Sequence, residues 1–434
     1  MPLPSVATRL LAGALCVAAV ASVTSAPAAA QDDAALVARA RAIHTRVMTL
    51  DTHVDISPAA FRADAANYVT GVERNQVDVP KMEAGGLDAA FLIVYTGQSA
   101  RLDSASYAAA YAQAMEKFAA IHRLTDTLAP TRVGLARTAD DARRIYASGR
   151  KVIFIGIENG FPVGTDLARI KQFADLGGRY LSLAHNGHSQ LSDSNTGERD
   201  GVWVHNGLSP LGRDAIKELN KWGIMIDISH PSKASMMQTL ALTQAPIMAS
   251  HSGVRALCNH SRNLDDEQLQ GIKQNNGVVQ LVAFNSYVKC DPAMAEARAA
   301  AVAALRSQFG IAGTNPREVA TAVDALSADR RAAYDARQAE IARQYPAASV
   351  KDFVDHIDYV VRLIGLDHAG ISSDFDGGGG VDGWRNASET FNVTLELVRR
   401  GYSEADIAKI WSGNLLRVLT DVQRSAARLQ RSPK

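Results

Sequence analysis

The most constraining feature of the sequence is a series of eight short apolar runs that alternate with polar loops and amphipathic stretches. Several runs, such as DAAFLIVY at residues 88–95, are almost continuously apolar, as is typical of strands buried on both faces of a parallel sheet. The predicted strands are residues 49–55, 88–95, 152–158, 179–185, 223–230, 245–251, 277–284 and 368–374. Helices are expected at residues 107–128, 208–222, 232–243 and 265–274. This alternation predicts an α/β fold, a (β/α)8 barrel of the TIM type.

A doubly wound sheet is the competing arrangement, but it usually has a glycine-rich phosphate-binding turn after an early strand. The loop at residues 56–59 contains no glycine, and the glycine run at 377–380 lacks the GK[ST] ending of a phosphate-binding loop. Residues 291–346, rich in Ala, Arg, Asp and Glu, interrupt the alternation. We expect this insertion to add two helices between strands seven and eight; a lid, a dimer surface and a neutral insertion all fit it. No linker divides the chain, so residues 31–434 are predicted to form a single barrel domain.

The first thirty residues have the pattern of a secretory signal peptide. Residues 10–23 are all apolar or small, Arg9 precedes them, and three alanines at 28–30 follow. We predict cleavage after Ala30, because the apolar run is shorter than the roughly 20 residues of a membrane anchor. No later apolar run is long enough to span a membrane, so no transmembrane span is expected after cleavage. An exported protein, periplasmic or secreted and of bacterial type, is the expected localisation.

Charge and cysteine content limit the partners further. Lys and Arg number 46 against 45 Asp and Glu, a net charge of +1, which provides no basic surface for a phosphate backbone and argues against nucleic acid. Beyond the predicted signal peptide, the chain has two cysteines, Cys258 and Cys290. A single disulfide in an oxidising compartment and two buried free thiols both fit these residues, and their spacing does not decide between them.

Metal-binding side chains stand at the ends of the predicted strands, where such a barrel places its active site. His53 and Asp55 are two residues apart, so both point to the same face of their strand. Glu158, His230 and His251 end three further strands. Three imidazoles and two carboxylates suit zinc or a similar cation. Since five ligands exceed what one catalytic zinc usually takes, we predict two zinc ions per chain, with Glu158 bridging a His53/Asp55 metal and a His230/His251 metal.

Four further polar residues are candidates for substrate chemistry. His185 ends the fourth predicted strand and suits polarisation of a carbonyl; a structural buried histidine is the alternative. Asp374 suits a proton shuttle from water to a leaving amine, and Asp376, otherwise a loop cap, is its rival. Arg262 offers a planar guanidinium that can hold a carboxylate, unless it is an exposed surface arginine.

Seven motifs, in their order and spacing, resemble those of the membrane (renal-type) dipeptidase family, zinc metallopeptidases of the amidohydrolase-like barrel superfamily. The motifs are DTHVDI (51–56), GIENG (156–160), LAHNGH (183–188), GLSPLG (207–212), DISH (227–230), SHSGVRALCNHSRN (250–263) and SSDFDG (372–377). The resemblance covers nearly all of the chain after the predicted signal peptide.

The resemblance implies that the five predicted ligands hold two zinc ions, with Glu158 between them. It also implies that His185 and Arg262 contact the substrate, that Tyr287 in NSYVKC helps to bind its carboxylate, and that Asp374 handles protons.

A disulfide between Cys258 and Cys290 and a homodimer are implied as well. Animal members of the family are lipid-anchored at a hydrophobic C-terminal tail, whereas residues 428–434 are polar here. The insertion at 291–346 also departs from the family pattern and is expected to affect substrate preference.

The expected function is zinc-dependent hydrolysis of the peptide bond in short L-Xaa-L/D-Xaa dipeptides by a hydroxide held between the two metals. The alternative is an N-acyl-D-amino-acid hydrolase, or another amide or lactone hydrolase, on the same dinuclear barrel. Relatives that use a carboxylated lysine bridge need a Lys at a strand end, whereas the third strand ends in Glu158, which favours the dipeptidase. A periplasmic binding protein that kept the barrel would be expected to lack ligands, and all five are present.

Overall fold

The computed structural model describes residue 1 and residues 28–313 and 316–431. Residues 2–27, which form most of the predicted signal peptide, lie outside the described residues, so signal cleavage stays a prediction.

Eight parallel strands follow one another around a barrel, in the order β1-β2-β4-β5-β6-β7-β8-β9. Their bounds are β1 Leu50–Asp55, β2 Ala89–Tyr95, β4 Lys151–Glu158, β5 Gly178–Ser182, β6 Met225–Asp227, β7 Met248–Ser252, β8 Val278–Val282 and β9 Ala369–Ser372. The barrel is nearly closed by Val54 in β1, which pairs in parallel with Phe375 just after β9. At the same point the Asp55 N–H donates to the Phe375 carbonyl at 2.9 Å. The TIM-type barrel predicted from the sequence is therefore confirmed.

The strands differ from the prediction in several places, most of them at strand ends. A ninth strand, β3 Val133–Leu135, pairs with β4 alone and was missed, since three residues are too few to show a period. β5 ends at Ser182 and β6 at Asp227, so His185 and His230 lie in the loops directly after their strands. β7 continues past His251 to Ser252.

Helices connect the strands, and the four predicted from the sequence are present as α3, α7, α8 and α9. The helices outside the insertion are α1 Ala28–His44, α2 Val79–Gly85, α3 Ser104–Arg123, α4 Ala139–Ala147, α5 Ala168–Asp175, α6 Gly197–Asp200, α7 Pro210–Trp222, α8 Lys233–Leu242, α9 Asp266–Gln274, α10 Asn285–Val288, α14 Val350–Ile364, α15 Phe391–Arg399, α16 Glu404–Ala408 and α17 Asn414–Arg431. Local sequence sets their ends. In α7 the Ser209 side chain accepts a hydrogen bond from the Gly212 N–H, and Gly223 ends the helix at φ 71°.

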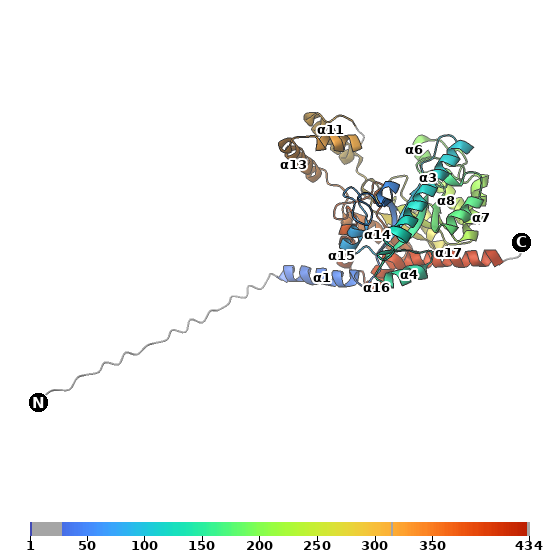
Figure 1. Cartoon of the computed structure of the whole chain (residues 1–434), viewed down its shortest axis with the longest axis horizontal. Helices are drawn as coiled ribbons and strands as arrows, with labels where there is room; N and C mark the ends of the chain where they lie inside the picture. The colour runs from blue at the N-terminus through green and yellow to red at the C-terminus, as the bar shows by residue number, and fades with distance from the viewer. Residues whose placement is uncertain (2–27, 314–315, 432–434) are drawn as a thin grey trace.

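The insertion between β8 and β9 contains three helices rather than the predicted two: α11 Pro292–Phe309, α12 Pro316–Asp324 and α13 Ala328–Gln344. The reason is the pair Gly310 and Gly313, both at positive φ, which ends α11 before α12 begins. The three helices share a small core of their own that includes Leu305, Tyr334 and Ile341. Figure 1 shows α11 and α13 projecting as a lobe from the barrel.

The C-terminal helix α17 closes the amino-terminal mouth of the barrel. Its Leu415 and Leu419 belong to one hydrophobic cluster with Phe91, Phe154 and Met248 from the strands. In Figure 1, α17 (red) runs across one end of the barrel. The opposite, carboxyl-terminal mouth is therefore the end that is left for the functional site.

One covalent link ties two loops at that functional end. Cys258, in the loop after β7, and Cys290, just after α10, form a disulfide with a Cα–Cα distance of 4.9 Å. The pairing implied by the resemblance is therefore confirmed. Among the described helices, none combines the length and the apolar character needed to cross a membrane.

Candidate metal centre and active site

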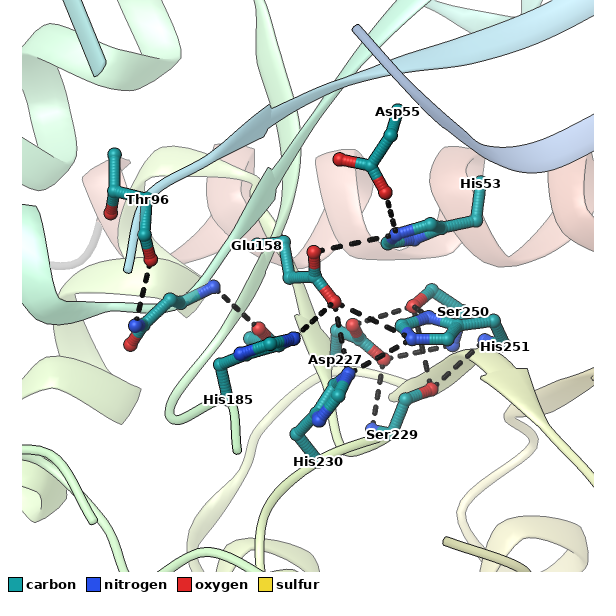
Figure 2. A network of polar contacts seen from close by, with 12 residues as sticks. His53, Asp55, Thr96, Glu158, His185, Asp227, Ser229, His230, Ser250 and His251 are labelled. Carbon is teal, nitrogen blue, oxygen red and sulfur yellow. Dashed lines mark hydrogen bonds and ion pairs between the residues drawn. The ribbon is translucent and has the colours of Figure 1, made fainter. Parts of the chain in front are cut away.

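The five predicted metal ligands meet at the carboxyl-terminal mouth of the barrel (Figure 2). They come from or directly follow four strands: His53 and Asp55 on β1, Glu158 at the end of β4, His230 after β6 and His251 in β7. A cavity of about 350 Å³ opens above them. It is lined by Asp55, Tyr95, Glu158, His185, Asn186, His230, His251, Arg262, Phe284, Tyr287, Asp374, Asp376 and Gly377.

Glu158 lies at the centre of the cluster, with its two oxygens facing different histidines. Oε2 is 3.5 Å from His53 Nε2. Oε1 is 2.9 Å from His230 Nε2 and 3.5 Å from His251 Nε2. Figure 2 shows the carboxylate between these rings. A carboxylate in this position can bridge two cations.

His53 shows that the cluster fits a metal. The side chain is fully buried, and its Nε2 has no hydrogen-bond partner. That nitrogen points at two carboxylates, 3.7 Å from Asp55 and 3.5 Å from Glu158. A buried polar atom without a partner needs an explanation, and a cation between imidazole and carboxylate provides one.

Three overlapping groups in the cluster have ligand atoms within 4.8 Å of one another. They are His53–Glu158–His251, Glu158–His185–His230 and His53–Asp55–Asp374. Because Glu158 and His53 each belong to two groups, the donor set has room for more than one cation. The donors are imidazoles and carboxylates, which suit zinc.

Burial and neighbouring charges favour the metal-binding forms of three of the ligands, Glu158, His230 and His251. Burial would raise the pKa of Glu158, but the His53 and His185 imidazoles outweigh it and hold that pKa well below the usual value. Burial, reinforced by the nearby Arg262 guanidinium, lowers the pKa of His230 well below the usual value. Burial lowers the pKa of His251 in the same way. The bridging carboxylate is therefore ionised and these two imidazoles are neutral, as metal ligands must be.

His185 and Asp374 lie beside the cluster. His185 Nε2 is 3.7 Å from Glu158 Oε1, and its ring is 4.3 Å from that of His230. Asp374 has a left-handed backbone at φ 58°. Burial raises the pKa of Asp374 to about 8; the charge of His53 opposes this shift and the Asp55 carboxylate adds to it. A carboxyl group of this kind can hold a proton near neutral pH and release it.

Arg262 is buried, so it is not the surface arginine that the sequence allowed. It is 2% exposed and lines the cavity, with Nη2 donating to the His251 carbonyl at 3.1 Å. Its Nε and Nη1 have no partner among the described residues. The guanidinium lies 5.5 Å from the centre of the Tyr287 ring, which itself stacks on Phe284 at 4.3 Å. Unpaired N–H groups of a guanidinium at the cavity can donate hydrogen bonds to an anionic group.

Asp376 behaves as the loop cap that was considered for it. Its carboxylate accepts hydrogen bonds from the Gln76 N–H at 2.7 Å and from the Val77 N–H at 3.2 Å. Other residues of the site were not singled out in the sequence. Asn186 Oδ1 lies 3.2 Å from His230 Nδ1, and this residue stands next to His185 in a quoted motif, which was a usable signal. The Tyr180 hydroxyl, 2.8 Å from His53 Nδ1, had no such signal.

A parallel barrel that gathers four histidines and three carboxylates at its carboxyl-terminal mouth defines a class, the metal-dependent hydrolases with the amidohydrolase-like barrel. Residues 37–433 match the membrane dipeptidase family (peptidase family M19), and the chain belongs to this family. It is a metallodipeptidase, a hydrolase acting on peptide bonds, of a zinc metallopeptidase family.

Named relatives and solved structures are similar to the chain over most of its length. The chain is 31% identical over 395 residues to Dipeptidase aclJ of Aspergillus oryzae, covering 89% of this chain and 80% of that protein. It is similar to the crystal structure of the probable dipeptidase PvdM from Pseudomonas aeruginosa, with a TM-score of 0.76, 33% identity, and 91% and 100% of the two chains covered. A metallopeptidase from Rhodobacter sphaeroides, solved with a phosphinate mimic of L-Ala-D-Ala, shares the fold at a TM-score of 0.65 and 21% identity, covering 87% and 99% of the chains.

Proposed function

We propose that the chain binds two zinc ions through His53, Asp55, Glu158, His230 and His251, and that it hydrolyses L-Xaa-L/D-Xaa dipeptides with a free carboxyl terminus. The observation that carries the proposal is the position of Glu158, whose Oε2 faces His53 while its Oε1 faces His230 and His251. A carboxylate whose two oxygens face different imidazoles can bridge two cations, as a dinuclear site requires.

When bound, the two zinc ions would supply a nucleophilic water and polarise the scissile carbonyl. The residues around them have complementary roles. His185 reaches the same cavity and is placed to donate a hydrogen bond to the carbonyl oxygen as negative charge develops there. Burial raises the pKa of Asp374 to about 8, so this carboxyl group can take up a proton near neutral pH and deliver it to the leaving amine.

Arg262 and Tyr287 would select the length of the substrate. The Arg262 guanidinium lines the cavity and has unpaired N–H groups, so it can make a charge-assisted hydrogen bond to a carboxylate. Tyr287 lines the same side of the cavity. A cavity of about 350 Å³ is at the small end of ligand pockets. A cation bound to Glu158 would hold the scissile bond at a set distance from Arg262, and so from the carboxyl terminus of the substrate. Dipeptides are therefore expected to be preferred over longer peptides.

The test combines metal analysis with a substrate panel. Zinc bound per chain is measured after gel filtration, and turnover is measured on dipeptides with an L- or a D-residue at the second position. Tripeptides and N-acyl-D-amino acids complete the panel. Two zinc ions per chain and turnover confined to dipeptides are expected. Fewer than two metals, or turnover of N-acyl-D-amino acids alone, would contradict the proposal.

We also propose that the protein is exported. The Cys258–Cys290 disulfide supports this, because such bonds persist in oxidising compartments and are rare in the cytosol of mesophiles. Expression of the full chain in a bacterial host, followed by N-terminal sequencing of the periplasmic fraction, should show a protein that begins at Gln31. An uncleaved protein retained in the cytoplasm would refute export.

A further inference from the structure

We propose that a polar layer inside the barrel, directly beneath the metal centre, fixes the proton positions of two ligand histidines. In this layer, Tyr180 positions His53, while Ser250, held by Asp227, positions His251. The inference rests on the proposed function, since it takes both histidines to be metal ligands. Tyr180, Asp227 and Ser250 are positioning residues and are not expected to touch the substrate.

The first half of the layer is Tyr180 on β5, which is fully buried. Its single hydroxyl proton is donated to the Thr52 carbonyl at 3.1 Å. The Tyr180 oxygen is also 2.8 Å from His53 Nδ1. Because the hydroxyl proton is already used, the bond to His53 requires that Nδ1 carries a proton and donates it. Nε2 is then the nitrogen that faces Asp55 and Glu158, where a metal would take the place of any proton on it.

The second half begins at Asp227 on β6, also fully buried. Asp227 Oδ1 accepts from the backbone N–H groups of Ser250 at 2.8 Å and Ser229 at 3.1 Å. Its Oδ2 accepts the Ser250 hydroxyl proton at 2.6 Å. Ser250 Oγ, 2.7 Å from His251 Nδ1, must therefore accept a hydrogen bond from that nitrogen. The proton of His251 is thereby placed on Nδ1, and its Nε2 is the nitrogen that faces Glu158. Figure 2 shows this chain of contacts.

Packing holds Tyr180 in place independently of any metal. An added Cβ at Gly156 would lie 2.2 Å from Tyr180 Cζ and 2.6 Å from its Oη, so only glycine leaves room for the ring. Phe91 stacks on the other side, with ring centres 5.3 Å apart. Gly156 stands two residues before Glu158, and so faces the same interior. This glycine therefore serves the metal centre through Tyr180.

The experiment compares Tyr180→Phe and Ser250→Ala with the wild-type enzyme. Tyr111→Phe is the matched control, because Tyr111 lies on the outer helix α3, away from the metal centre. Its hydroxyl donates to Gln172 of α5 at 2.9 Å and accepts from the same side chain at 2.7 Å. Zinc dissociation constants are measured by competition with a chelator. Nitrogen-15 spectra of histidine-labelled, metal-free protein report which ring nitrogen carries the proton. Thermal unfolding checks that each variant is folded.

Removal of a partner of this kind should weaken one zinc site about 10- to 100-fold. In the metal-free protein, Tyr180→Phe should shift the Nδ1–H signal of His53, because the acceptor of its hydrogen bond is removed, and Ser250→Ala should shift that of His251. Tyr111→Phe should match the wild type in both measurements. Zinc affinities within twofold of wild type, with unchanged Nδ1–H signals in both variants, would overturn the inference. A wild-type enzyme with fewer than two zinc ions would instead count against the proposed function, and the metal-free spectra would still decide on the polar layer.

Discussion

Replacement of both cysteines, Cys258→Ser with Cys290→Ser, should destabilise the protein and loosen its substrate site. The disulfide joins the loop that carries Arg262 to the segment that carries Tyr287. The bonded residues are separated by 32 positions. For a closed loop of that length, the chain-entropy relation gives a loss of about 3.7 kcal/mol at 25 °C, because the unfolded chain becomes less restricted.

The folded state should change little, because a second link remains. Asn263 Nδ2 donates to the carbonyls of Cys258 and Tyr287, both at 2.8 Å, and so holds the two loops together without the sulfur atoms. We therefore expect the main effect of the double substitution to be a lower free energy of unfolding. A smaller effect is expected on catalysis, as a rise in KM with kcat preserved, since the two loops carry the residues proposed to hold the substrate carboxylate and not the scissile bond.

Urea unfolding, followed by tryptophan fluorescence, measures the loss. Wild-type protein treated with dithiothreitol is the control, and its unfolding curve should coincide with that of the double variant. Dipeptide kinetics measured in parallel provide KM and kcat. A loss below about 1 kcal/mol would refute the loop-entropy argument. A fall in kcat with unchanged KM would refute the assignment of these loops to the carboxylate.

Three further predictions follow from the site and the core. His230→Ala should leave fewer than two zinc ions per chain and abolish nearly all turnover; a variant that keeps both metals and its rate would contradict the ligand assignment. Arg262→Lys should lower kcat/KM for dipeptides about 10- to 100-fold, since a hydrogen bond to a charged group contributes roughly 1.5–3 kcal/mol. Dipeptide amides lack the carboxylate, so kcat/KM for these substrates should show no comparable loss. Burial lowers the pKa of His356, whose Nδ1 accepts from the Val254 N–H and whose Nε2 donates to the Val288 carbonyl. The stability that this neutral ring provides is therefore present above the ordinary histidine pKa of about 6.5 and is lost as the pH falls below it. Between pH 7.5 and pH 5.5 the melting temperature should fall less in His356→Gln than in the wild type. An equal fall in both proteins would exclude His356 as the cause.

The barrel could be predicted because its strands are buried on both faces. A run such as FLIVY in β2 must be apolar at every position, and this leaves a signal that no surface strand gives. The ligands could be predicted for a related reason. An imidazole or carboxylate directly after such a run is expensive to bury without a partner, so His251 and Glu158 stand out against their apolar surroundings.

Features that depend on three-dimensional packing were not predictable in this way. Tyr180 looks like any other aromatic strand residue, and its contact with His53 depends on the gap left by Gly156 on a neighbouring strand. β3 is too short to show a period and pairs with one neighbour only. The burial of Arg262 was equally hidden, because the loop after β7 carries no hydrophobic pattern that reveals which of its side chains turn inward.

The position of α17 has a consequence for how the protein is made. Leu415 and Leu419 complete the apolar packing at the amino-terminal mouth of the barrel, yet they are synthesised more than 300 residues after Phe91. Phe91 and Phe154 therefore lack their final covering until residues 414–431 have been translated, although their strands emerge early. Surface of this kind on an incomplete chain favours aggregation. The nascent protein thus depends on α17 to cover a core begun several hundred residues earlier, and a chain cut short before residue 414 would form a barrel with one end open.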